Sequence, residues 1–575
     1  MTAQHSHTHA PPSISRSNPQ VSDPGRQQIS AADTRVHDIV GIGIGPFGLG
    51  LAALSDPLPD VDAVFLDRRP EFRWHPGMMI EGATVQVPFL ADLVTMADPT
   101  SPFSFLQFLK DRGRLYPFYI RESFYPLRAE FDEYCRWVAA QLGSLRWNRA
   151  VTSVTDVDGI YEITVEVTDT CGRFVDIESY HARHVVLGVG TQPVLPEALA
   201  ELLTGERTET GISTAGTRRG DAGAARRGGP VIHTADYLDH REELLESGSV
   251  TIIGSGQSAA EIYRDLIEDA EARGVRLDWV TRSPRFFPME YTKLTLEMTS
   301  PEYTDHFRAL PDDLRGRIGR EQRTLYKGIS GDLIDDIHDT LYRLSRGGRS
   351  LLTNLVTDAE LIAAHTDERG AAAHPDGPGA SAHPHEHGAD TRSAPGEYLL
   401  EFRHTVLDER FTRRTGAIVA ATGYRASVPD FLTPIREEIR LDDQGRFAAD
   451  RDYTLNEAGT LHVLGVEEHT HGVTAPDLGF GPWRASVVLA QVTGREPYLI
   501  ERRIAFQTFG VPSAEAPAEC PAAAVAQPGH PDEPEVPAHP GDTAQPGDTA
   551  HPNDTHPDDT HLGDAAAPSK EMTHA

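Results

Sequence analysis

The 575-residue chain has little cysteine, no long hydrophobic run and fewer basic than acidic residues. Cys135, Cys171 and Cys520 are too few and too scattered for a disulfide framework, and no pair has metal-ligand spacing. There is no run of about 18 apolar residues and no apolar segment behind basic residues at the N-terminus, so neither a membrane span nor an export signal is indicated. The 86 acidic against 53 basic residues argue against nucleic acid or an anionic membrane as a partner. We expect a cytoplasmic protein without a metal site.

Four segments have compositions typical of disordered or variable chain. They are residues 1–35, 204–229, 365–396 and 511–575, the last of which is rich in Pro, Ala, Asp and His. Such segments bury too little apolar surface to offset their chain entropy. The histidines of the tail could bind transition metals weakly, but a solvated spacer is the simpler interpretation. The remaining core is large enough for two nucleotide-binding domains and a small third element.

Two glycine fingerprints stand out in this core. The first is Gly43-Ile44-Gly45-Pro46-Phe47-Gly48, and the second is Gly254-Ser255-Gly256-Gln257-Ser258-Ala259; each follows an apolar, β-branched run. The first glycine permits a tight turn from strand to helix, the second lets the backbone approach a pyrophosphate, and the small third residue allows close packing. A glycine-rich turn without a nucleotide is the alternative for either one. Two in one chain predict an enzyme with two nucleotide cofactors.

The residues that end the following strands distinguish the two sites. Asp67 lies about 20 residues beyond the first fingerprint, where a carboxylate accepts a hydrogen bond from a ribose hydroxyl of FAD or NAD. Arg282 and Arg285 follow the corresponding strand of the second site, where a guanidinium suits the 2′-phosphate of NADPH. The alternative for these arginines is a pair of solvated loop charges.

Two further strand-to-glycine segments are typical of places where a chain crosses between an FAD and an NADPH domain. They are residues 185–193 and Ala417 to Tyr424, the latter with Thr422 and Gly423 as cofactor-side residues. We predict an α/β fold with two Rossmann-like dinucleotide-binding domains, a small substrate-binding element and disordered tails. The predicted FAD domain consists of residues 36–200 and 398–510, and the latter segment also contains the substrate element. The predicted NADPH domain, with a substrate-region segment, is residues 231–351.

A set of motifs distributed over this core is specific in combination. They are Gly41 to Phe47, Phe72-Arg73-Trp74-His75-Pro76-Gly77-Met78, Phe89-Leu90-Ala91-Asp92-Leu93, Pro99 to Phe105, Gly254 to Glu261, Ala421 to Tyr424 and His471-Gly472. Together they resemble the flavin-dependent N-hydroxylating monooxygenases of siderophore biosynthesis. The segments from Glu297 to Tyr303 and from Lys327 to Ile329 resemble the lysine and diamine hydroxylases more than the ornithine branch. Gly48 is a departure, because many relatives have asparagine there.

The resemblance implies a mechanism and several site residues. NADPH reduces FAD, dioxygen adds to the reduced flavin to give a 4a-hydroperoxide, and the substrate amine attacks its distal oxygen. Trp74 and His75 belong to the flavin pocket, and His75 is not needed as a base. Gln86 resembles the flavin-side glutamine near the reacting atoms, with an ordinary strand-face amide as the alternative. Family members are often tetrameric, so a homo-oligomer is expected.

Nucleophilic attack requires a neutral amine, whereas an alkyl amine with a pKa near 10.4 is mostly protonated at neutral pH. A desolvated pocket lowers that pKa. We therefore expect apolar residues such as Phe89 and Leu296 around the reacting amine, with plain core packing as the alternative for each.

Ala91 is the residue on which the predicted substrate depends most. Relatives that hydroxylate ornithine or lysine have a lysine there, which neutralises the carboxylate of the amino acid. A buried carboxylate without a cation is strongly disfavoured, so a diamine such as putrescine or cadaverine fits better. Leu296 and Leu325, which stand roughly where ornithine enzymes carry polar amides, favour the same substrate class. Glu290, Glu297 and Asp92 are the candidate partners of the distal ammonium.

Other functions remain as alternatives. An L-lysine or L-ornithine N-monooxygenase is the first alternative, and a generic flavin monooxygenase is the second. A flavoprotein disulfide reductase would need a Cys-x-x-Cys pair or its near equivalent, which the isolated cysteines do not supply. The paired fingerprints with flavin-side motifs do not favour a non-catalytic sensor.

Overall fold

A computed structural model describes residues 35–203, 229–367 and 398–512, all of which belong to one compact unit, Met1–Pro512. Most of the four segments expected to be disordered lie outside the described residues. Within these ranges Cys135 is a buried free thiol and Cys171 an exposed one. No helix in the described part of the chain is both long and apolar enough to cross a bilayer.

The first sheet carries the first fingerprint. It is seven-stranded, with the order β3-β2-β1-β6-β5-β4, and β17 pairs with β6. Its strands are β1 (Val36–Ile42), β2 (Ala63–Leu66), β3 (Leu145–Arg146), β4 (Arg149–Val157), β5 (Ile160–Thr168), β6 (Phe174–Leu187) and β17 (Leu461–Val463). The central strands β2, β1 and β6 are parallel, and Val40 of β1 lies between Val64 and Val185. Neighbouring residues of β1 face opposite cores, Ile39 one and Val40 the other, because side chains alternate along a strand.

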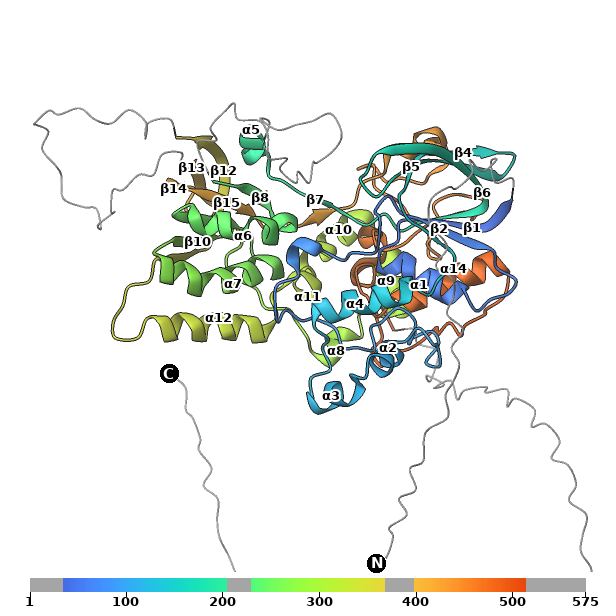
Figure 1. Cartoon of the computed structure of the whole chain (residues 1–575), viewed down its shortest axis with the longest axis horizontal. Coiled ribbons are helices and arrows are strands. Elements are labelled where there is room, and N and C mark those ends of the chain that lie inside the picture. The colour runs from blue at the N-terminus through green and yellow to red at the C-terminus, as the bar shows by residue number, and fades with distance from the viewer. Residues whose placement is uncertain (1–34, 204–228, 368–397, 513–575) are drawn as a thin grey trace, which may run out of the picture. The chain divides into compact units, whose positions relative to one another are not determined.

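Helices cover one face of this sheet. They are α1 (Pro46–Ser55), α2 (Phe105–Asp111), α3 (Leu115–Ile120), α4 (Arg128–Ala139) and α14 (Gly481–Thr493). Helix α2 begins where the Ser104 side chain accepts a hydrogen bond from Gln107 N. Helix α14 ends at Gly494, whose φ of 67° favours glycine. Figure 1 shows α1, α4 and α14 close together beside this sheet.

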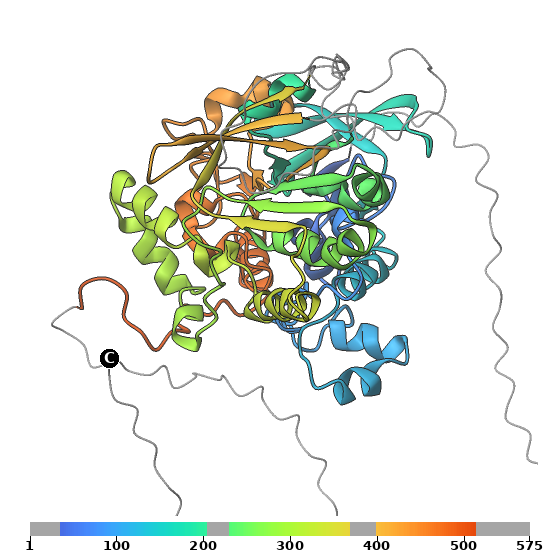
Figure 2. The ribbon, with the colours of Figure 1, turned by 90° about the vertical axis from the view of Figure 1, so that its left-hand side faces the viewer.

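The second sheet carries the second fingerprint and is parallel throughout, with the order β11-β10-β9-β15-β8. Its strands are β8 (Val231–His233), β9 (Ser249–Ile253), β10 (Arg276–Val280), β11 (Thr353–Val356) and β15 (Ala417–Ala420). One face packs on α6 (Tyr237–Glu246), α7 (Gln257–Arg273) and α12 (Gly331–Leu344), and the green helices among these are seen beside the strands in Figure 2. Parallel strands covered on both faces are buried along their whole length, which explains why all five residues of Ser249–Ile253 are buried.

A small antiparallel sheet covers the other face of the second sheet. It consists of β12 (Ala359–Thr366), β13 (Tyr398–His404) and β14 (Arg410–Thr415). Ile253 packs in the same cluster as Leu400 and Phe402 of β13, whereas its neighbour Ile252 packs with the helices on the opposite face. The alternation along β9 therefore places this small sheet against the second nucleotide-binding sheet.

The observed pairing of β15 corrects one predicted domain boundary. Residues 398–510 are expected from the sequence to belong to the FAD domain, but β15 pairs in parallel with β8 and β9 of the second sheet. Strand pairing joins segments that are far apart in the sequence, so the apolar pattern of Ala417–Ala420 alone does not reveal the sheet to which it belongs. The chain returns to the first sheet only after this strand.

Two short strands lie where the chain crosses between the sheets. Strand β7 (Gln192–Pro193) pairs antiparallel with β16 (Tyr424–Arg425), and Figure 1 shows β7 between the two sheets. The other α-helices of the described residues are α5 (Ala200–Leu203), α8 (Lys293–Leu296), α9 (Pro301–Ala309), α10 (Asp312–Glu321), α11 (Thr324–Lys327) and α13 (Glu468–His471). The 3-10 helices are η1 (Pro76–Met78), η2 (Glu197–Leu199), η4 (Thr234–Asp236), η6 (Asp430–Glu438) and η7 (Gly472–Thr474). The predicted α/β fold with two nucleotide-binding sheets is thus confirmed.

Candidate functional site

The first fingerprint forms a turn in which each glycine has a different steric reason. Gly43 has a φ of 101°, and a Cβ there would lie 2.4 Å from the carbonyl oxygen of Gly188. A Cβ at Gly48 would lie 2.2 Å from the carbonyl oxygen of Gly43. At Gly45, which precedes Pro46 at the start of α1, a Cβ would have no atom within 4 Å. The turn is closely packed at Gly43 and Gly48 but open at Gly45. The open space fits a pyrophosphate at the N-terminus of α1.

Asp67 lies beside this turn at the end of β2. Its Oδ2 accepts a hydrogen bond from Ile44 N at 2.8 Å, and Arg69 forms an ion pair with it at 2.9 Å. Burial raises the pKa of Asp67, but the hydrogen bonds and charge of Arg69 outweigh that effect and the pKa is lowered. Asp67 is therefore an anion that fixes the fingerprint turn. Its role as the ribose acceptor remains a prediction.

Trp74 and His75 follow on a loop that contacts the second half of the molecule. The Trp74 ring packs against Phe131, with ring centroids 5.0 Å apart, and His75 lies 5.9 Å from the ring of Tyr424. His75 has a φ of 47°, a left-handed conformation uncommon outside glycine. The surrounding protein and then the positive charges of Arg128 and Arg69 lower the pKa of His75 to about 4. The imidazole is neutral at pH 7, although part of it is open to solvent.

Gln86 is half-buried and its side chain is held locally. Its side-chain Nε2 donates to the carbonyl oxygen of Thr84 at 2.9 Å. The main-chain carbonyl oxygen of Gln86 accepts a hydrogen bond from the Tyr291 hydroxyl at 2.5 Å. These bonds fix both the amide and the backbone, as a residue with a positioning role requires. The proposed flavin-side role of Gln86 remains a prediction.

Ala91 lines a small cavity shared with the first fingerprint. Residues in its wall include Pro46, Phe47, Ala91, Asp92, Leu478 and Gly481, from three separate parts of the chain. No lysine or arginine of the described residues lines it. Phe89 is half-buried near this loop and packs against Phe118, with ring centroids 5.7 Å apart. The structure thus brings Ala91 next to the predicted cofactor turn, whereas the Phe89 contacts are those of core packing.

The second fingerprint repeats the steric pattern of the first. Gly254 has a φ of 142°, and a Cβ there would lie 2.0 Å from the carbonyl oxygen of Ala421. At Gly256, the N-cap of α7, the atom nearest to an added Cβ would be 3.7 Å away. Gln257 donates to Glu261 and accepts from Ser330 N, while Ser258 is half-buried at the start of α7. This second open helix N-terminus also fits a dinucleotide pyrophosphate.

Arg282 and Arg285 lie in the loop after β10, next to the second fingerprint. A hydrogen bond of 3.1 Å between the Ser255 and Ser283 hydroxyls ties this loop to the turn. Both arginines are exposed, and the Arg285 guanidinium lies 4.5 Å from the centre of the Phe287 ring. Neither arginine forms an ion pair with a described acidic residue, so both guanidinium groups are open to an anionic ligand.

Thr422 and Gly423 lie at the crossing between the sheets. The Thr422 hydroxyl donates to the carbonyl oxygen of Val194, and the Gly423 carbonyl oxygen accepts a hydrogen bond of 3.0 Å from Val194 N. The Gly423 carbonyl oxygen also lies 3.0 Å from Nε2 of His233. The two crossings are therefore tied to each other, which fixes one nucleotide-binding part against the other.

An ion pair at the junction was not expected from the sequence. Arg128 of α4 forms a buried ion pair with Glu261 of α7, at 2.6 Å, and also donates to the carbonyl oxygen of Met78. Gln257 of the second fingerprint donates to the same carboxylate. The partners are 133 residues apart, so no local sequence signal identifies the pair. Glu261 does stand inside the motif that follows the second fingerprint.

Leu296 and Leu325 are not brought to the Ala91 cavity. Leu296 lies at the end of α8 and is 49% exposed. Leu325 packs in a separate cluster that contains Tyr303 and Phe307. Among the lining residues of the cavity neither leucine is present. Their substrate-facing role remains a prediction.

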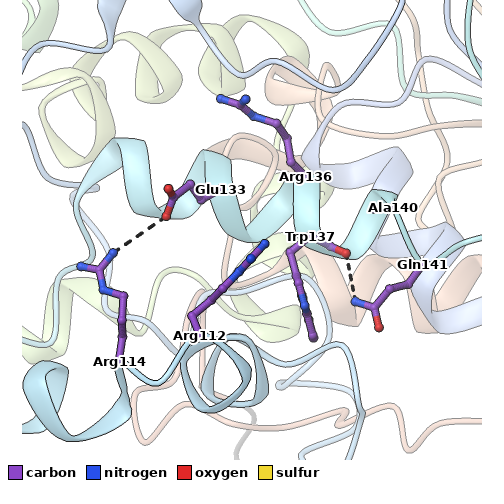
Figure 3. A pocket seen from close by; sticks show the side chains of 7 residues that line it. All are labelled: Arg112, Arg114, Glu133, Arg136, Trp137, Ala140 and Gln141. Carbon is purple, nitrogen blue, oxygen red and sulfur yellow. Dashed lines mark hydrogen bonds and ion pairs between the residues drawn. The ribbon is translucent and has the colours of Figure 1, made fainter. Parts of the chain in front are cut away.

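A wider surface pocket between α2 and α4 shares no residue with the predicted site. It is lined by Arg112, Arg114, Glu133, Arg136, Trp137, Ala140 and Gln141 (Figure 3). Arg114 pairs with Glu130 and Glu133, and Arg136 pairs with Asp132. Arg114 and Arg136 are thus engaged in ion pairs, and the pocket lies apart from both glycine fingerprints.

Comparisons with known proteins agree with this geometry. The family model of L-lysine 6-monooxygenase/L-ornithine 5-monooxygenase matches residues 35–227 and 220–374. A putrescine N-hydroxylase of Shewanella oneidensis is 41% identical over 480 residues, which are 83% of this chain and 85% of that protein. The chain belongs to this family of N-hydroxylating monooxygenases. The resemblance drawn from the motifs is thereby confirmed.

Solved structures of relatives bear on the cofactors. The cadaverine monooxygenase DfoA of Erwinia amylovora, determined with FAD, is 40% identical with a TM-score of 0.72 and matches 84% of this chain and 100% of its own. An ornithine N-hydroxylase of Kutzneria sp. 744, determined with reduced FAD, NADP⁺ and L-ornithine, is 25% identical with a TM-score of 0.64, over 80% of this chain and 99% of its own. FAD is thus present in both of these structures and NADP⁺ in the second, in agreement with the predicted cofactor pair of FAD and NADPH.

Proposed function

We propose that the chain is an FAD- and NADPH-dependent monooxygenase that hydroxylates one amino group of a short aliphatic diamine, putrescine or cadaverine, for a hydroxamate siderophore. The observation that carries this proposal is Ala91 in a cavity wall without a cation, beside the first nucleotide turn. An amino-acid substrate would place its carboxylate there without a partner, at a cost of several kcal/mol. Relatives named for putrescine and cadaverine, at 41% and 40% identity, support the same substrate class.

Bound FAD supplies the redox chemistry that activates dioxygen, with electrons from NADPH. The residues of the chain do the positioning. Gly45 and Gly256 leave room for the two pyrophosphates, and the Arg128–Glu261 pair holds the two nucleotide-binding parts together. A desolvated environment at the reacting amine would lower its pKa, so that a larger share is neutral.

The proposal is tested by incubating the purified protein with NADPH, oxygen and each of four amines: putrescine, cadaverine, L-ornithine and L-lysine. NADPH oxidation and trapped hydroxylamine are measured together. We expect stoichiometric hydroxylamine with at least one diamine and little with either amino acid. NADPH oxidation without hydroxylamine from any of the four amines would contradict N-hydroxylation itself.

A first prediction concerns the 2′-phosphate of NADPH. Arg282→Ala and Arg285→Ala, tested singly, are expected to raise the KM for NADPH by about tenfold for at least one of them, because a charge-assisted hydrogen bond is lost. The KM for NADH should stay nearly unchanged, since NADH lacks that phosphate. Arg317→Ala, an exposed arginine on α10, is the matched control. Equal effects on both cofactors would remove these arginines from the phosphate site.

A second prediction concerns Gln86. Gln86→Ala is expected to retain FAD but to divert reducing equivalents, so that hydrogen peroxide replaces part of the hydroxylated product. The physical reason is that the side-chain amide, which is held on the carbonyl oxygen of Thr84, is removed, whereas the hydrogen bond from Tyr291 to the main-chain carbonyl oxygen of residue 86 is kept. The ratio of hydroxylamine to NADPH consumed is the measurement. A variant that is as tightly coupled as the wild type would exclude Gln86 from the reacting region.

We infer a homo-oligomer, a tetramer by family resemblance, acting in the cytoplasm on small-molecule substrates. Light scattering of the purified FAD-loaded protein gives the molar mass directly. A monomer at micromolar concentration would contradict the inferred assembly.

A further inference from the structure

The distal ammonium of a bound diamine needs an anionic or polar partner, and the carboxylates named from the sequence already have hydrogen-bond partners in the structure. Asp92 is buried, and its carboxylate accepts four hydrogen bonds from Val94 N, Thr95 N, the Thr95 hydroxyl and Phe105 N. Glu297 accepts hydrogen bonds from the backbone and side chain of Gln507. Glu290 is exposed and bonds to the Thr324 hydroxyl. Asp92 is a structural acid that orders its own loop.

Asp477 is a different carboxylate, in the segment that leads into α14. A Cβ added at Gly479 would lie 3.2 Å from Asp477 Oδ1 and 3.4 Å from Ala91 Cβ. The carboxylate and the methyl group of Ala91 thus flank one point. The neighbours Leu478 and Gly481 line the same cavity as Ala91 and Pro46.

The segment that carries Asp477 is rigidly anchored to the first fingerprint. Arg484 is buried and pairs with buried Glu467 at 2.7 Å, and it donates to the carbonyl oxygens of Ala475 and Asp477. Its guanidinium lies 4.1 Å from the centre of the Phe47 ring. One arginine therefore fixes the backbone of Asp477 relative to the predicted flavin turn.

The Asp477 side chain is half-buried and has no ion-pair partner among the described residues. Its Oδ1 accepts a hydrogen bond from Phe480 N at 2.8 Å. Burial raises the pKa of Asp477, and the N–H groups of Phe480 and Gly479, with the charge of Arg484, only partly offset that rise. A carboxylate in such surroundings is stabilised by an added cation. The charge of Asp477 also acts on Tyr291, whose hydroxyl bonds to Gln86, so the carboxylate and Gln86 belong to one region.

We propose that Asp477 binds the distal ammonium of the diamine, which places the other amino group toward Gln86. This inference rests on the proposed function. It explains the combination seen here: the cation that would bind an amino-acid carboxylate is replaced by Ala91, and an anion stands beside it. In enzymes that carry lysine at this position a cation binds the carboxylate of the substrate, whereas here an anion would bind an ammonium group.

The test compares diamines with monoamines of the same length. In wild-type holoenzyme we expect kcat/KM to be higher for putrescine than for butylamine, and higher for cadaverine than for pentylamine. Asp477→Asn should lower kcat/KM for the diamines by about tenfold or more, mainly through KM, because the charge-assisted bond is lost. Turnover of the monoamines, FAD content and the KM for NADPH should change little. Glu437→Gln, at an exposed acid outside the predicted site, is the matched control and should behave as the wild type.

A second variant keeps the test decisive if Asp477→Asn loses FAD or fails to fold. Asp477→Glu retains the charge but extends it by one methylene, and should shift the preference from cadaverine toward putrescine. An unchanged ratio of diamine to monoamine efficiency in Asp477→Asn, or an unchanged ratio of cadaverine to putrescine efficiency in Asp477→Glu, would overturn the role of Asp477. Wild-type protein that hydroxylates no diamine would instead overturn the proposed function, so the two failures are distinguishable.

Discussion

Replacing Gly45 with valine is expected to give a folded protein that purifies with less than about a tenth of the wild-type FAD content. The backbone of Gly45 is in an ordinary extended conformation, with φ −83° and ψ −177°, and a Cβ added there would have no atom within 4 Å. The Cβ of the new side chain therefore meets no protein atom. It fills the space at the start of α1 that a pyrophosphate would occupy.

Two other glycines make this result specific. Gly143→Val places valine at a second open glycine, outside the site, and should retain FAD. Gly48→Val would put a Cβ 2.2 Å from the carbonyl oxygen of Gly43, and should lower the thermal unfolding temperature as well as FAD content. The flavin absorbance gives the FAD content and circular dichroism gives the melting temperature. A Gly45→Val protein with full FAD content would place the cofactor elsewhere.

Replacing Ala91 with lysine is expected to lower kcat/KM for both diamines by about a hundredfold. The new ammonium would stand beside the Asp477 carboxylate, where it would pair with that anion and repel the distal ammonium of the substrate. L-Lysine or L-ornithine should gain activity relative to the diamines, because their carboxylate would now have a cation.

Ala91→Met separates size from charge in this experiment. Methionine is long and unbranched, like lysine, but neutral. We expect it to reduce diamine turnover less than lysine does and to give no gain with the amino acids. Equal losses for lysine and methionine would mean that the cavity is sensitive to volume alone, and that the charge argument at Ala91 is wrong.

The nucleotide turns can be predicted from the sequence because their requirements are local. Gly43 and Gly254 have φ values of 101° and 142°, and a Cβ at Gly48 would lie 2.2 Å from the carbonyl oxygen of Gly43 in the same turn. The assignment of β15 cannot be predicted in the same way, because it pairs with β9, which lies far earlier in the chain. Its apolar pattern fits a buried strand in either sheet.

The candidate site shows the same division. Ala91 is identifiable because one motif contains it, and the structure places it next to Pro46 in a cavity. Asp92 is a reasonable candidate acid from the sequence, but its hydrogen bonds to Phe105 N and to its own loop use the carboxylate. Asp477 escapes sequence reasoning since it approaches Ala91 only through the tertiary fold. Its one sequence signal is that it follows the His471-Gly472 motif closely.

The central claim is that the substrate is a diamine, and a competition experiment tests it most directly. Wild-type holoenzyme receives equal concentrations of putrescine, cadaverine, L-ornithine and L-lysine with limiting NADPH, and mass spectrometry quantifies each N-hydroxylated product. The ratios of early products equal the ratios of kcat/KM. The account predicts that one or both N-hydroxydiamines dominate. A predominance of N-hydroxylated ornithine or lysine would contradict it, and would require a cation for the carboxylate other than residue 91.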